Sequence, residues 1–598
     1  TRPMTYAWPG LAFLTAGWIG LPGVTLRAAR AADVLWTVPD GDWAQGSNWS
    51  TGAPPGPTDA ALFNLNAGAG VTPTAHVTSD AGGVTTLSLA NGNRVNIENG
   101  GALAVNGGSN PSAGVRIGDG SVGSLNLAGV ARLTTTSGDV GGDFHVGMGD
   151  GGIGTLNVNA GALVSPRDLV VGDATGVGVV NQTGGTVTAG GPGNGALVVG
   201  RDGGNGTYNL SGGTLNNQAT GSSDVNFMIG IGGGSGKFVM TGGTVNVTAG
   251  TSSALGTFTV ARGPGSKGTF EMSGGTLHTT GAFRMASYES IGVGDMTGTA
   301  TQTGGQITAD RWVSVAEGGV GTYNLSGGRL VAADDFNISD IDNSHGTLNL
   351  SGTGYAQGST VYVAKSPGGV GVVNQTGGTM VAAGLMLADN ATASGTYNLS
   401  GGVLDMHGGG IVLGFNGGHG AYAFNMTGGE LKNPAGFGFP FVQQGGTLYV
   451  GDADDIGKLG LAFDYTLGPN AIIDFDIRGS LDQFNLDQVH IEKNGVVVTL
   501  QGKLQTHVTI NPTPGQQFTI IHNNFGAGLP IVGSFDGLPE GSIFESGGAR
   551  FQITYAGGAF GHDVVLTALA TPEPGTLGLL GVAAVALVGV RRRRAEGF

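Results

Sequence analysis

The sequence predicts an all-β protein built as a parallel β-helix, or β-solenoid, of about 12 stacked coils. Glycine accounts for 121 of 598 residues and charged residues for 11%, which is typical of many tight turns and suits neither a helical protein nor a charged disordered chain. A core resembling GTYNLSGGTL, clearest at Gly206, Gly321 and Gly395, recurs about a dozen times between residues 123 and 435. We also expect an N-terminal cap, a C-terminal β-rich domain and a single C-terminal hydrophobic helix.

Each repeat is expected to hold two strands and two turns, because every core is followed by a second short apolar run such as LVVG from Leu169. Alternation along the core places Tyr208 and Leu210 on one face and Asn209 on the other. One repeat cannot bury its apolar face alone, whereas equivalent strands stacked about 4.8 Å apart form a continuous core. The glycine pair that ends each core, as in Gly212–Gly213, is expected at a corner with a positive φ.

One core position is leucine in some repeats, such as Leu210, and glutamine in others, namely Gln182, Gln302 and Gln375. Inward glutamines would need hydrogen-bonding partners on neighbouring coils, and outward leucines would be exposed. The sequence leaves both orientations open.

Three consecutive repeats are lengthened at the same turn, within residues 187–196, 216–226 and 246–257. Insertions confined to one corner of adjacent coils would stack into a lateral patch rich in Gly, Ser, Thr and Asn. We hypothesise that a glycan or a neighbouring molecule docks there, as binding loops often do on rigid scaffolds. The alternative is a surface insertion without a function.

The N-terminal residues 1–32 are expected to be a signal peptide. Residues 11–26 are mostly apolar, and Ala29 and Ala31 supply the small-x-small pattern that signal peptidase recognises. The mature chain would begin near Ala32 or Asp33, and its partners would include signal peptidase and the secretion machinery. The thin basic region upstream, only Arg2, suggests a truncated start or a start at Met4.

Residues 33–122 are expected to form the N-terminal cap and the first coils. Trp36, Trp43 and Trp49 are three of the six tryptophans, and their clustering favours a packed cap that covers the open end of the solenoid. Carbohydrate binding through exposed aromatic rings is the alternative.

Residues 123–435 carry the solenoid repeats, and residues 436–570 are expected to form a β-rich domain that continues or caps the rod. Alternation places Ile473 and Phe475 opposite Asp474 and Asp476, which indicates a strand. Asn494-Gly495 between two apolar runs predicts a type I′ hairpin. The segments 551–558 and 562–569 resemble a closing hairpin.

Residues 571–598 combine three features in order: Pro572-Glu573-Pro574, an uncharged run over 575–590, and the basic tail Arg591, Arg592, Arg593 and Arg594. An apolar segment followed by arginines is a stop-transfer signal for a transmembrane helix. At about 1.5 Å per residue the run reaches roughly 24 Å, short of the roughly 30 Å hydrocarbon core. It therefore suits a transient anchor in the inner membrane better than a permanent one.

This order resembles the PEP-CTERM sorting signal of Gram-negative bacteria. The resemblance implies cleavage near the PEP triplet by an exosortase-type transpeptidase and release to the cell surface or extracellular matrix. The N-terminal segment and the Gly-rich repeats also resemble autotransporter-like passenger domains and the repeats of PEP-CTERM proteins. That second resemblance supports the architecture more than any activity.

The composition excludes several kinds of chemistry. The chain has no cysteine, so disulfides, thiol catalysis and cysteine metal sites are absent, and a net charge of −16 argues against nucleic acid as a partner. We expect no catalytic residues, no cofactor and no metal site. Two acidic groups could hold a hard cation, although solvated turn residues are the favoured interpretation: Asp340, Asp342 and His345, and Asp452, Asp454 and Asp455.

The sequence thus predicts an exported, non-enzymatic structural or adhesive protein of the cell surface or biofilm matrix, with exopolysaccharide as a candidate partner. The first alternative is an adhesin that recognises a specific polysaccharide through the stacked loops. A β-helix polysaccharide lyase or hydrolase is the less favoured alternative, because the basic residues of the repeats occupy mixed positions. These are Arg201, Arg262, Arg284, Arg311, Arg329 and Lys365.

Overall fold

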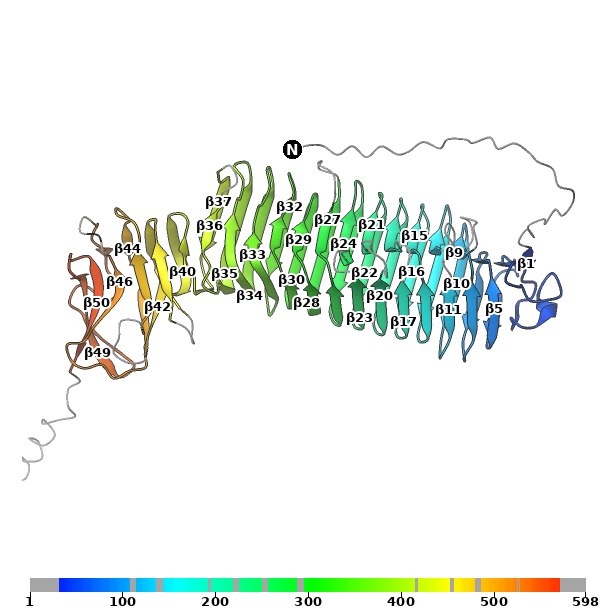
Figure 1. The fold of residues 1–598 in the computed structure, drawn as a ribbon, viewed down its shortest axis with the longest axis horizontal. Coiled ribbons are helices and arrows are strands. Elements are labelled where there is room, and N and C mark those ends of the chain that lie inside the picture. The colour runs from blue at the N-terminus through cyan, green and yellow to red at the C-terminus, as the bar shows by residue number, and fades with distance from the viewer. Residues whose placement is uncertain are drawn as a thin grey trace, which may run out of the picture.

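The protein is a long β-solenoid of about 16 turns, as the computed structural model shows (Figure 1). The structure describes residues 32–570 except 108–113, 136–142, 192–194, 219–224, 250–255, 288–294, 415–417, 452–455, 479–484, 524 and 526–527. The predicted all-β parallel solenoid is confirmed.

Each turn contributes to three parallel ladders that run along the rod. The first ladder consists of β2 (Asp40–Asp42), β4 (Thr74–Val77), β7 (Asn93–Ile97), β10 (Val122–Leu127), β13 (Ile153–Val158), β16 (Val177–Gln182), β19 (Asn205–Leu210), β22 (Ser235–Met240), β25 (Lys267–Met272), β28 (Thr297–Ala309), β30 (Val320–Ala332), β32 (His345–Leu350), β34 (Val370–Leu387), β35 (Ser394–Asp405), β37 (Ala421–Met426), β40 (Phe441–Tyr449), β42 (Tyr465–Ile477), β44 (Val498–Leu500) and β47 (Val532–Gly533).

The second ladder begins at β5 and shares its longest strands with the first, because those strands bend around the corner without a break. It adds β5 (Asp80–Val84), β8 (Ala102–Val105), β11 (Arg132–Thr135), β14 (Ala162–Ser165), β17 (Thr186–Ala189), β20 (Thr214–Gln218), β23 (Thr244–Thr248), β26 (Thr276–Thr279), β33 (Tyr355–Tyr362), β38 (Glu430–Lys432) and β45 (Lys503–Val508).

The third ladder closes each turn and also takes in the ends of β33 and β34. It adds β1 (Asp33–Leu35), β3 (Ala60–Phe63), β6 (Thr86–Leu89), β9 (Gly114–Asp119), β12 (Phe144–Met148), β15 (Leu169–Asp173), β18 (Leu197–Arg201), β21 (Val225–Ile231), β24 (Gly256–Arg262), β27 (Phe283–Ser287), β29 (Val313–Ala316), β31 (Phe336–Ser339), β36 (Ile411–Leu413), β39 (Gly436–Phe437), β41 (Lys458–Leu461), β43 (Gln488–Ile491) and β46 (Gln517–His522).

The expectation of two strands per repeat was wrong, because the repeat core bends in its middle and supplies strands to two ladders. In the turn that begins at Gly206, β19 and β20 are separated by Ser211, Gly212 and Gly213. Gly213 has a φ of +81°, and a Cβ on Gly212 would lie 2.5 Å from the carbonyl oxygen of Thr183. The first glycine therefore permits close stacking of the turns, and the second forms the corner with a positive φ, as predicted.

The number of turns also exceeds the predicted 12. The ladders begin at β1 and continue to β47, so coils precede and follow the repeated motif. Parallel stacking requires alternating apolar side chains and turns of suitable length, and these occur without the GTYNLSGG pattern. The count of about 12 came from the motif alone, so it was too low, although coils within residues 33–122 were expected.

The core is a continuous apolar column in the interior of the rod. Tyr208 and Leu210 are 0% and 1% exposed, which confirms the predicted alternation. The glutamines at the variable core position also point inward: Gln182, Gln302 and Gln375 are all 0% exposed. The amide nitrogen of Gln182 donates to the carbonyl oxygens of Gly185 and Thr214, and its oxygen accepts from the hydroxyl of Tyr208 in the next turn. The inward alternative is thus correct.

The tryptophans of the first turn are a packed plug. Trp36, Trp43 and Trp49 are 1–3% exposed, and the ring centroid of Trp49 lies 5.0 Å from that of Trp36 and 4.8 Å from that of Trp43. Phe63 contacts all three rings. The short 3₁₀ helix η1 (Gly46–Asn48) lies in the same connection. The packed-cap prediction is confirmed, and sugar stacking on these rings is excluded because their faces are buried.

The C-terminal part continues the parallel ladders through β47 and then ends in an antiparallel sheet. β48 (Ile543–Ser546), β49 (Ala549–Gly557) and β50 (Asp563–Leu569) pair in sequence order, and β50 also pairs with β46. The predicted closing hairpin is therefore confirmed. At the other end of this region, Ile473 and Phe475 lie in β42 as predicted.

The predicted hairpin at Asn494-Gly495 was wrong. β43 and β44 flank this turn but pair in parallel with the preceding and following turns. Gly495 has a φ of +86° whereas Asn494 has no positive φ, so the turn is not of type I′. The apolar runs on both sides find partners in the stack, and the turn becomes a corner of the coil.

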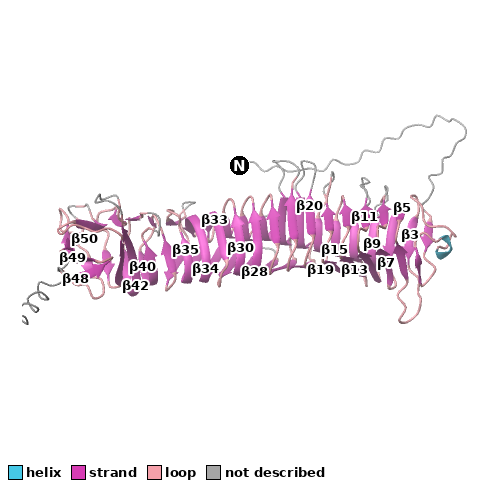
Figure 2. Cartoon of the chain, turned by 90° about the horizontal axis from the view of Figure 1, so that it is seen from below, coloured by secondary structure: helices cyan, strands magenta, loops and turns pink. Residues whose placement is uncertain are grey.

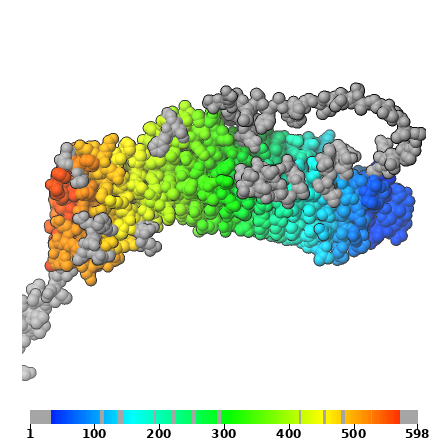
Figure 3. Space-filling view, in the orientation of Figure 1, coloured from blue at the N-terminus to red at the C-terminus, as the bar shows by residue number. Residues whose placement is uncertain are grey.

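Figure 2 shows the same rod from a second direction, with strands along its whole length, and Figure 3 shows its elongated surface. No helix within the described residues is long and apolar enough to cross a bilayer. The predicted signal peptide, with Ala29 and Ala31, and the predicted transmembrane helix over 575–590 lie outside the described residues.

Candidate functional site

The outer face of the first ladder carries two columns of stacked asparagines. In each column the amide nitrogen of one asparagine donates to the side-chain oxygen of the asparagine in the preceding turn, over 2.7–3.0 Å. The first column is Asn96, Asn126, Asn157, Asn181 and Asn209, and the second is Asn324, Asn349, Asn374, Asn398 and Asn425.

Val239, Glu271 and Thr301 occupy the same position in the three turns between the two columns. Glu271 forms an ion pair of 2.8 Å with Lys237, two residues before Val239. A primary amide has two donors and an acceptor oxygen with two lone pairs, so each stacked asparagine keeps donor and acceptor capacity for an external group. The two columns, called here the amide columns, thus present an uncharged polar array with a repeat of about 4.8 Å.

The lengthened corners lie where predicted. The insertions connect β17 to β18, β20 to β21 and β23 to β24, and these strands stack in consecutive turns. Residues 192–194, 219–224 and 250–255 of the insertions lie outside the described residues. Their alignment at one corner is confirmed, and the docking hypothesis stays a prediction.

Charged residues of the third ladder pair with residues of neighbouring turns. Arg201 lies 2.8 Å from Asp173, Arg284 lies 3.4 Å from Glu317, and Lys365 lies 3.4 Å from Asp340 in their closest N–O contacts. Burial works against the charged form of Asp173, but hydrogen bonds from His145 and Arg201 hold its pKa below its usual range. Burial raises the pKa of Asp340 despite the nearby Lys365.

The other basic residues considered for a lyase site have separate surroundings. The guanidinium of Arg329 lies 3.7 Å from the ring centroid of Tyr355, Arg311 is 3.8 Å from Asp334, and Arg262 approaches Met228. These side chains hold adjacent turns together at different points along the rod. They do not converge on one paired-carboxylate arrangement.

No group of three or more histidine, aspartate or glutamate side chains in the described part of the chain could hold a metal ion. Asp340 is paired with Lys365, so it differs from the solvated turn residue that we expected. Asp452, Asp454 and Asp455 lie outside the described residues.

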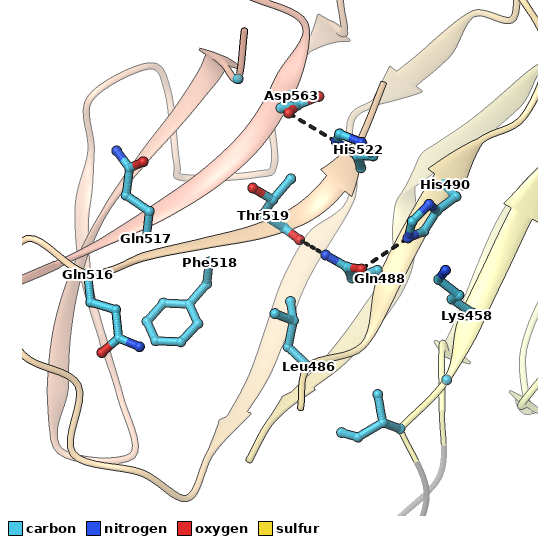
Figure 4. A pocket seen from close by; sticks show the side chains of 13 residues that line it. Lys458, Leu486, Gln488, His490, Gln516, Gln517, Phe518, Thr519, His522 and Asp563 are labelled. Carbon is cyan, nitrogen blue, oxygen red and sulfur yellow. Dashed lines mark hydrogen bonds and ion pairs between the residues drawn. The ribbon is translucent and has the colours of Figure 1, made fainter. Parts of the chain in front are cut away.

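A pocket of about 660 Å³ lies near the C-terminal end of the rod, between β41, β43, β46 and β50 (Figure 4). Lys458, His490 and His522 line it from three neighbouring strands, and the ring centroids of the two histidines are 5.6 Å apart. Burial and the nearby positive charges of Lys458 and His522 lower the pKa of His490. We call this the terminal pocket.

The polar groups of the terminal pocket are held by their neighbours. Nδ1 of His522 lies 3.2 Å from a carboxylate oxygen of Asp563. The amide nitrogen of Gln488 donates to the carbonyl oxygen of Thr519 over 2.9 Å, and its oxygen lies 3.0 Å from Nε2 of His490. Sequence reasoning missed this site, because its residues are spread over more than a hundred positions and match no motif.

The C-terminal segment matches a known protein-family model. Residues 570–594 match the PEP-CTERM protein-sorting motif, and the matched range includes Pro572, Glu573, Pro574 and the arginines Arg591–Arg594. Such a motif indicates an exported protein of the cell surface and implies processing by exosortase-type machinery. A comparison with curated proteins found no match for this chain.

Proposed function

We propose that this protein is a non-enzymatic structural and adhesive rod, displayed on the surface or in the exopolysaccharide matrix of a Gram-negative bacterium. The sorting motif supports export, and the solenoid supplies a stiff body suited to a structural or surface role. The observation that carries the adhesive part is the pair of amide columns on the first ladder.

The amide columns suit many weak contacts with a polysaccharide. They repeat the same uncharged donors and acceptors in successive turns, and the hydrogen bonds between neighbours fix the amide orientation in advance. A polymer that can contact several turns at once gains avidity although each contact is weak.

The proposed processing begins with signal peptidase after Ala31 and ends with cleavage near Pro572-Glu573-Pro574. The apolar run over 575–590, held by the four arginines, would anchor the chain transiently in the inner membrane. Mass spectrometry of the mature C-terminus tests this step. A terminus near Pro572 agrees with it, and a chain that retains Arg591–Arg594 contradicts it.

The adhesive role is tested by removing the amides from three successive turns. The variant Asn324→Ala, Asn349→Ala, Asn374→Ala is compared with the matched variant Val331→Ala, Gln357→Ala, Val381→Ala, which alters the outer face of the second ladder in the same three turns. Co-sedimentation with purified exopolysaccharide of the producing strain should fall several-fold only for the first variant. If both variants co-sediment with the exopolysaccharide to the same extent, the amide columns do not carry the adhesion.

Two alternatives have their own outcomes in the same assay. Binding that survives loss of the amides but disappears when the corner insertions are shortened would favour a specific adhesin that uses the stacked loops. Depolymerisation of pectin, alginate or the host exopolysaccharide by the purified protein would favour a β-helix lyase or hydrolase and contradict the structural role.

A further inference from the structure

The terminal pocket combines a positive charge with groups that suit a sugar. Lys458 is exposed at the pocket and forms no ion pair with any described residue. Gln488, Gln517 and Thr519 add neutral hydrogen-bonding groups. The chain as a whole carries 41 acidic and 25 basic residues, so an unpaired lysine beside two histidines differs from the surface around it.

Among the described residues near the pocket, the acidic groups are either occupied or directed elsewhere. The two carboxylate oxygens of Asp563 contact Nδ1 of His522 and the backbone nitrogen of Asn523. Asp487 accepts from the backbone nitrogens of Gly457 and Asp476 and is 2% exposed. Glu492 follows the end of β43, lies against Gly460 of β41, and is not among the residues that line the pocket. Within the described lining, the charged side chain left for a ligand is therefore that of Lys458.

The walls also include apolar side chains. Leu486 and Phe518 are 5% exposed, and both face the pocket in Figure 4. A site with apolar walls and several oriented polar groups, and with a volume within the range of about 300–1,000 Å³, is typical of small-molecule and sugar pockets. The C–H faces of a pyranose ring would contact the walls while its hydroxyls reach the amides.

We propose that the terminal pocket binds a carboxylated sugar unit, such as a uronic acid residue of an acidic polysaccharide, with Lys458 contacting the carboxylate. One exposed lysine matches the single negative charge of a carboxylate. His522, oriented by Asp563, and the side chains of Gln488 and Gln517 supply hydrogen bonds to the sugar hydroxyls. The pocket lies in other turns than the amide columns, so this inference does not rest on the proposed adhesive surface.

Binding of a tetramer of 1,4-linked galacturonic acid to the exported protein, measured by isothermal titration calorimetry, tests the assignment. The matched probe is the same tetramer with its carboxyl groups reduced to alcohols. We expect the acidic tetramer to bind and the reduced tetramer to bind at least about tenfold more weakly, as expected for loss of a charge-assisted contact. Equal affinity for both probes would overturn the role of the carboxylate.

The variants Lys458→Gln and Gln517→Ala alter exposed pocket residues and leave the core unchanged. Lys458→Gln should weaken binding of the acidic tetramer about tenfold, and Gln517→Ala a few-fold. Lys503→Gln removes an exposed lysine of β45 outside the pocket and should change the affinity less than about twofold. An equal loss in Lys503→Gln would show non-specific attraction and overturn the site.

Two further outcomes would also overturn the proposal. One is the absence of binding up to about 10 mM tetramer, a concentration at which even weak specific complexes form. The other is displacement of the tetramer by an equal concentration of inorganic phosphate, which would indicate a general anion site. The Asn324→Ala, Asn349→Ala, Asn374→Ala variant should bind the tetramer normally, so failure of the adhesive surface and failure of the pocket are distinguishable.

Discussion

The hydroxyl of Tyr208 donates a 2.6 Å hydrogen bond to the side-chain oxygen of Gln182, which belongs to the preceding turn of the solenoid. Both side chains are fully buried. The same pairing recurs between Tyr323 and Gln302, between Tyr397 and Gln375, and between Tyr465 and Gln443, over 2.6–2.7 Å. Burial raises the pKa of each tyrosine, so the hydroxyl stays protonated and remains a donor.

The pairing explains why the core position alternates between glutamine and apolar residues. The core position is glutamine in every turn that is followed by a turn with a tyrosine beside it, as Gln182 is followed by Tyr208. The core position is apolar where the following turn places a different residue there, as Leu210 is followed by Phe238. The two amide hydrogens of each glutamine go to main-chain carbonyls, so both the donors and the acceptor of the buried amide are satisfied.

The first prediction concerns this buried pair. Tyr208→Phe leaves the side-chain oxygen of Gln182 without a partner, so the free energy of unfolding should fall by about 1–3 kcal/mol. The double variant Gln182→Leu, Tyr208→Phe restores the apolar pairing of other turns and should recover part of the loss. Urea unfolding followed by circular dichroism measures both. If the double variant loses as much unfolding free energy as Tyr208→Phe and Gln182→Leu lose together as single variants, the two residues do not act as a pair.

The second prediction uses two glycines of β34 that differ only in their surroundings. A Cβ on Gly371 would lie 1.3 Å from the carbonyl oxygen of Val363, whereas the nearest atom to a Cβ on Gly384 is 3.7 Å away. Gly371→Ala must displace the backbone and should destabilise the rod by about 3 kcal/mol or more, and Gly384→Ala should change stability by less than about 0.5 kcal/mol. Thermal unfolding compares the two, and equal melting temperatures would contradict the stacking.

The third prediction is a pH dependence near the N-terminus. The two ring nitrogens of His76 lie 2.8 Å from Glu98 and 3.1 Å from Asp40, and the hydrogen bond to Glu98 is the largest cause of its raised pKa. A raised folded-state pKa adds stability that is complete below the ordinary value of 6.5 and disappears as pH rises through the folded value. The pairs are partly exposed to solvent, so the gain should stay below about 1 kcal/mol.

Tryptophan fluorescence can follow this effect, because Trp36, Trp43 and Trp49 lie in the first turn. The urea midpoint of the fluorescence change should be higher at pH 5.5 than at pH 8.5 in the parent, with a smaller difference in His76→Gln. If the parent and His76→Gln show the same difference in urea midpoint between pH 5.5 and pH 8.5, His76 is not the titrating group.

The fourth prediction concerns the tryptophan plug. Trp43→Ala removes a ring that is 2% exposed and packs on Trp49 and Phe63, so it should cost about 3–5 kcal/mol locally. In a repeat architecture each turn contacts only its neighbours, so the damage should remain near the end. Hydrogen exchange should therefore accelerate in β3 and β4 and stay unchanged in β30 and β32. Uniform acceleration along the rod would contradict a local plug.

Much of the fold followed from local patterns. Alternation at Tyr208, Asn209 and Leu210 defines a strand with one buried face, and the glycine pair after it defines a corner. The insertions fell at one corner because equivalent positions in the repeats occupy equivalent positions in space. The candidate pocket could not be found this way, since Lys458, His490 and His522 meet only through the stacking of β41, β43 and β46.

Residue patterns along the chain were enough to predict a parallel β-solenoid with a packed first turn and a C-terminal sorting motif, because strand alternation, turn glycines and contiguous motifs depend on neighbouring residues. Three features became visible only in the folded protein: each turn has three strands, Asn494-Gly495 is a corner, and Gln182 faces Tyr208. Each of these depends on contact with another turn, since a strand in a solenoid pairs with the turns before and after it and not with its nearest neighbour along the chain.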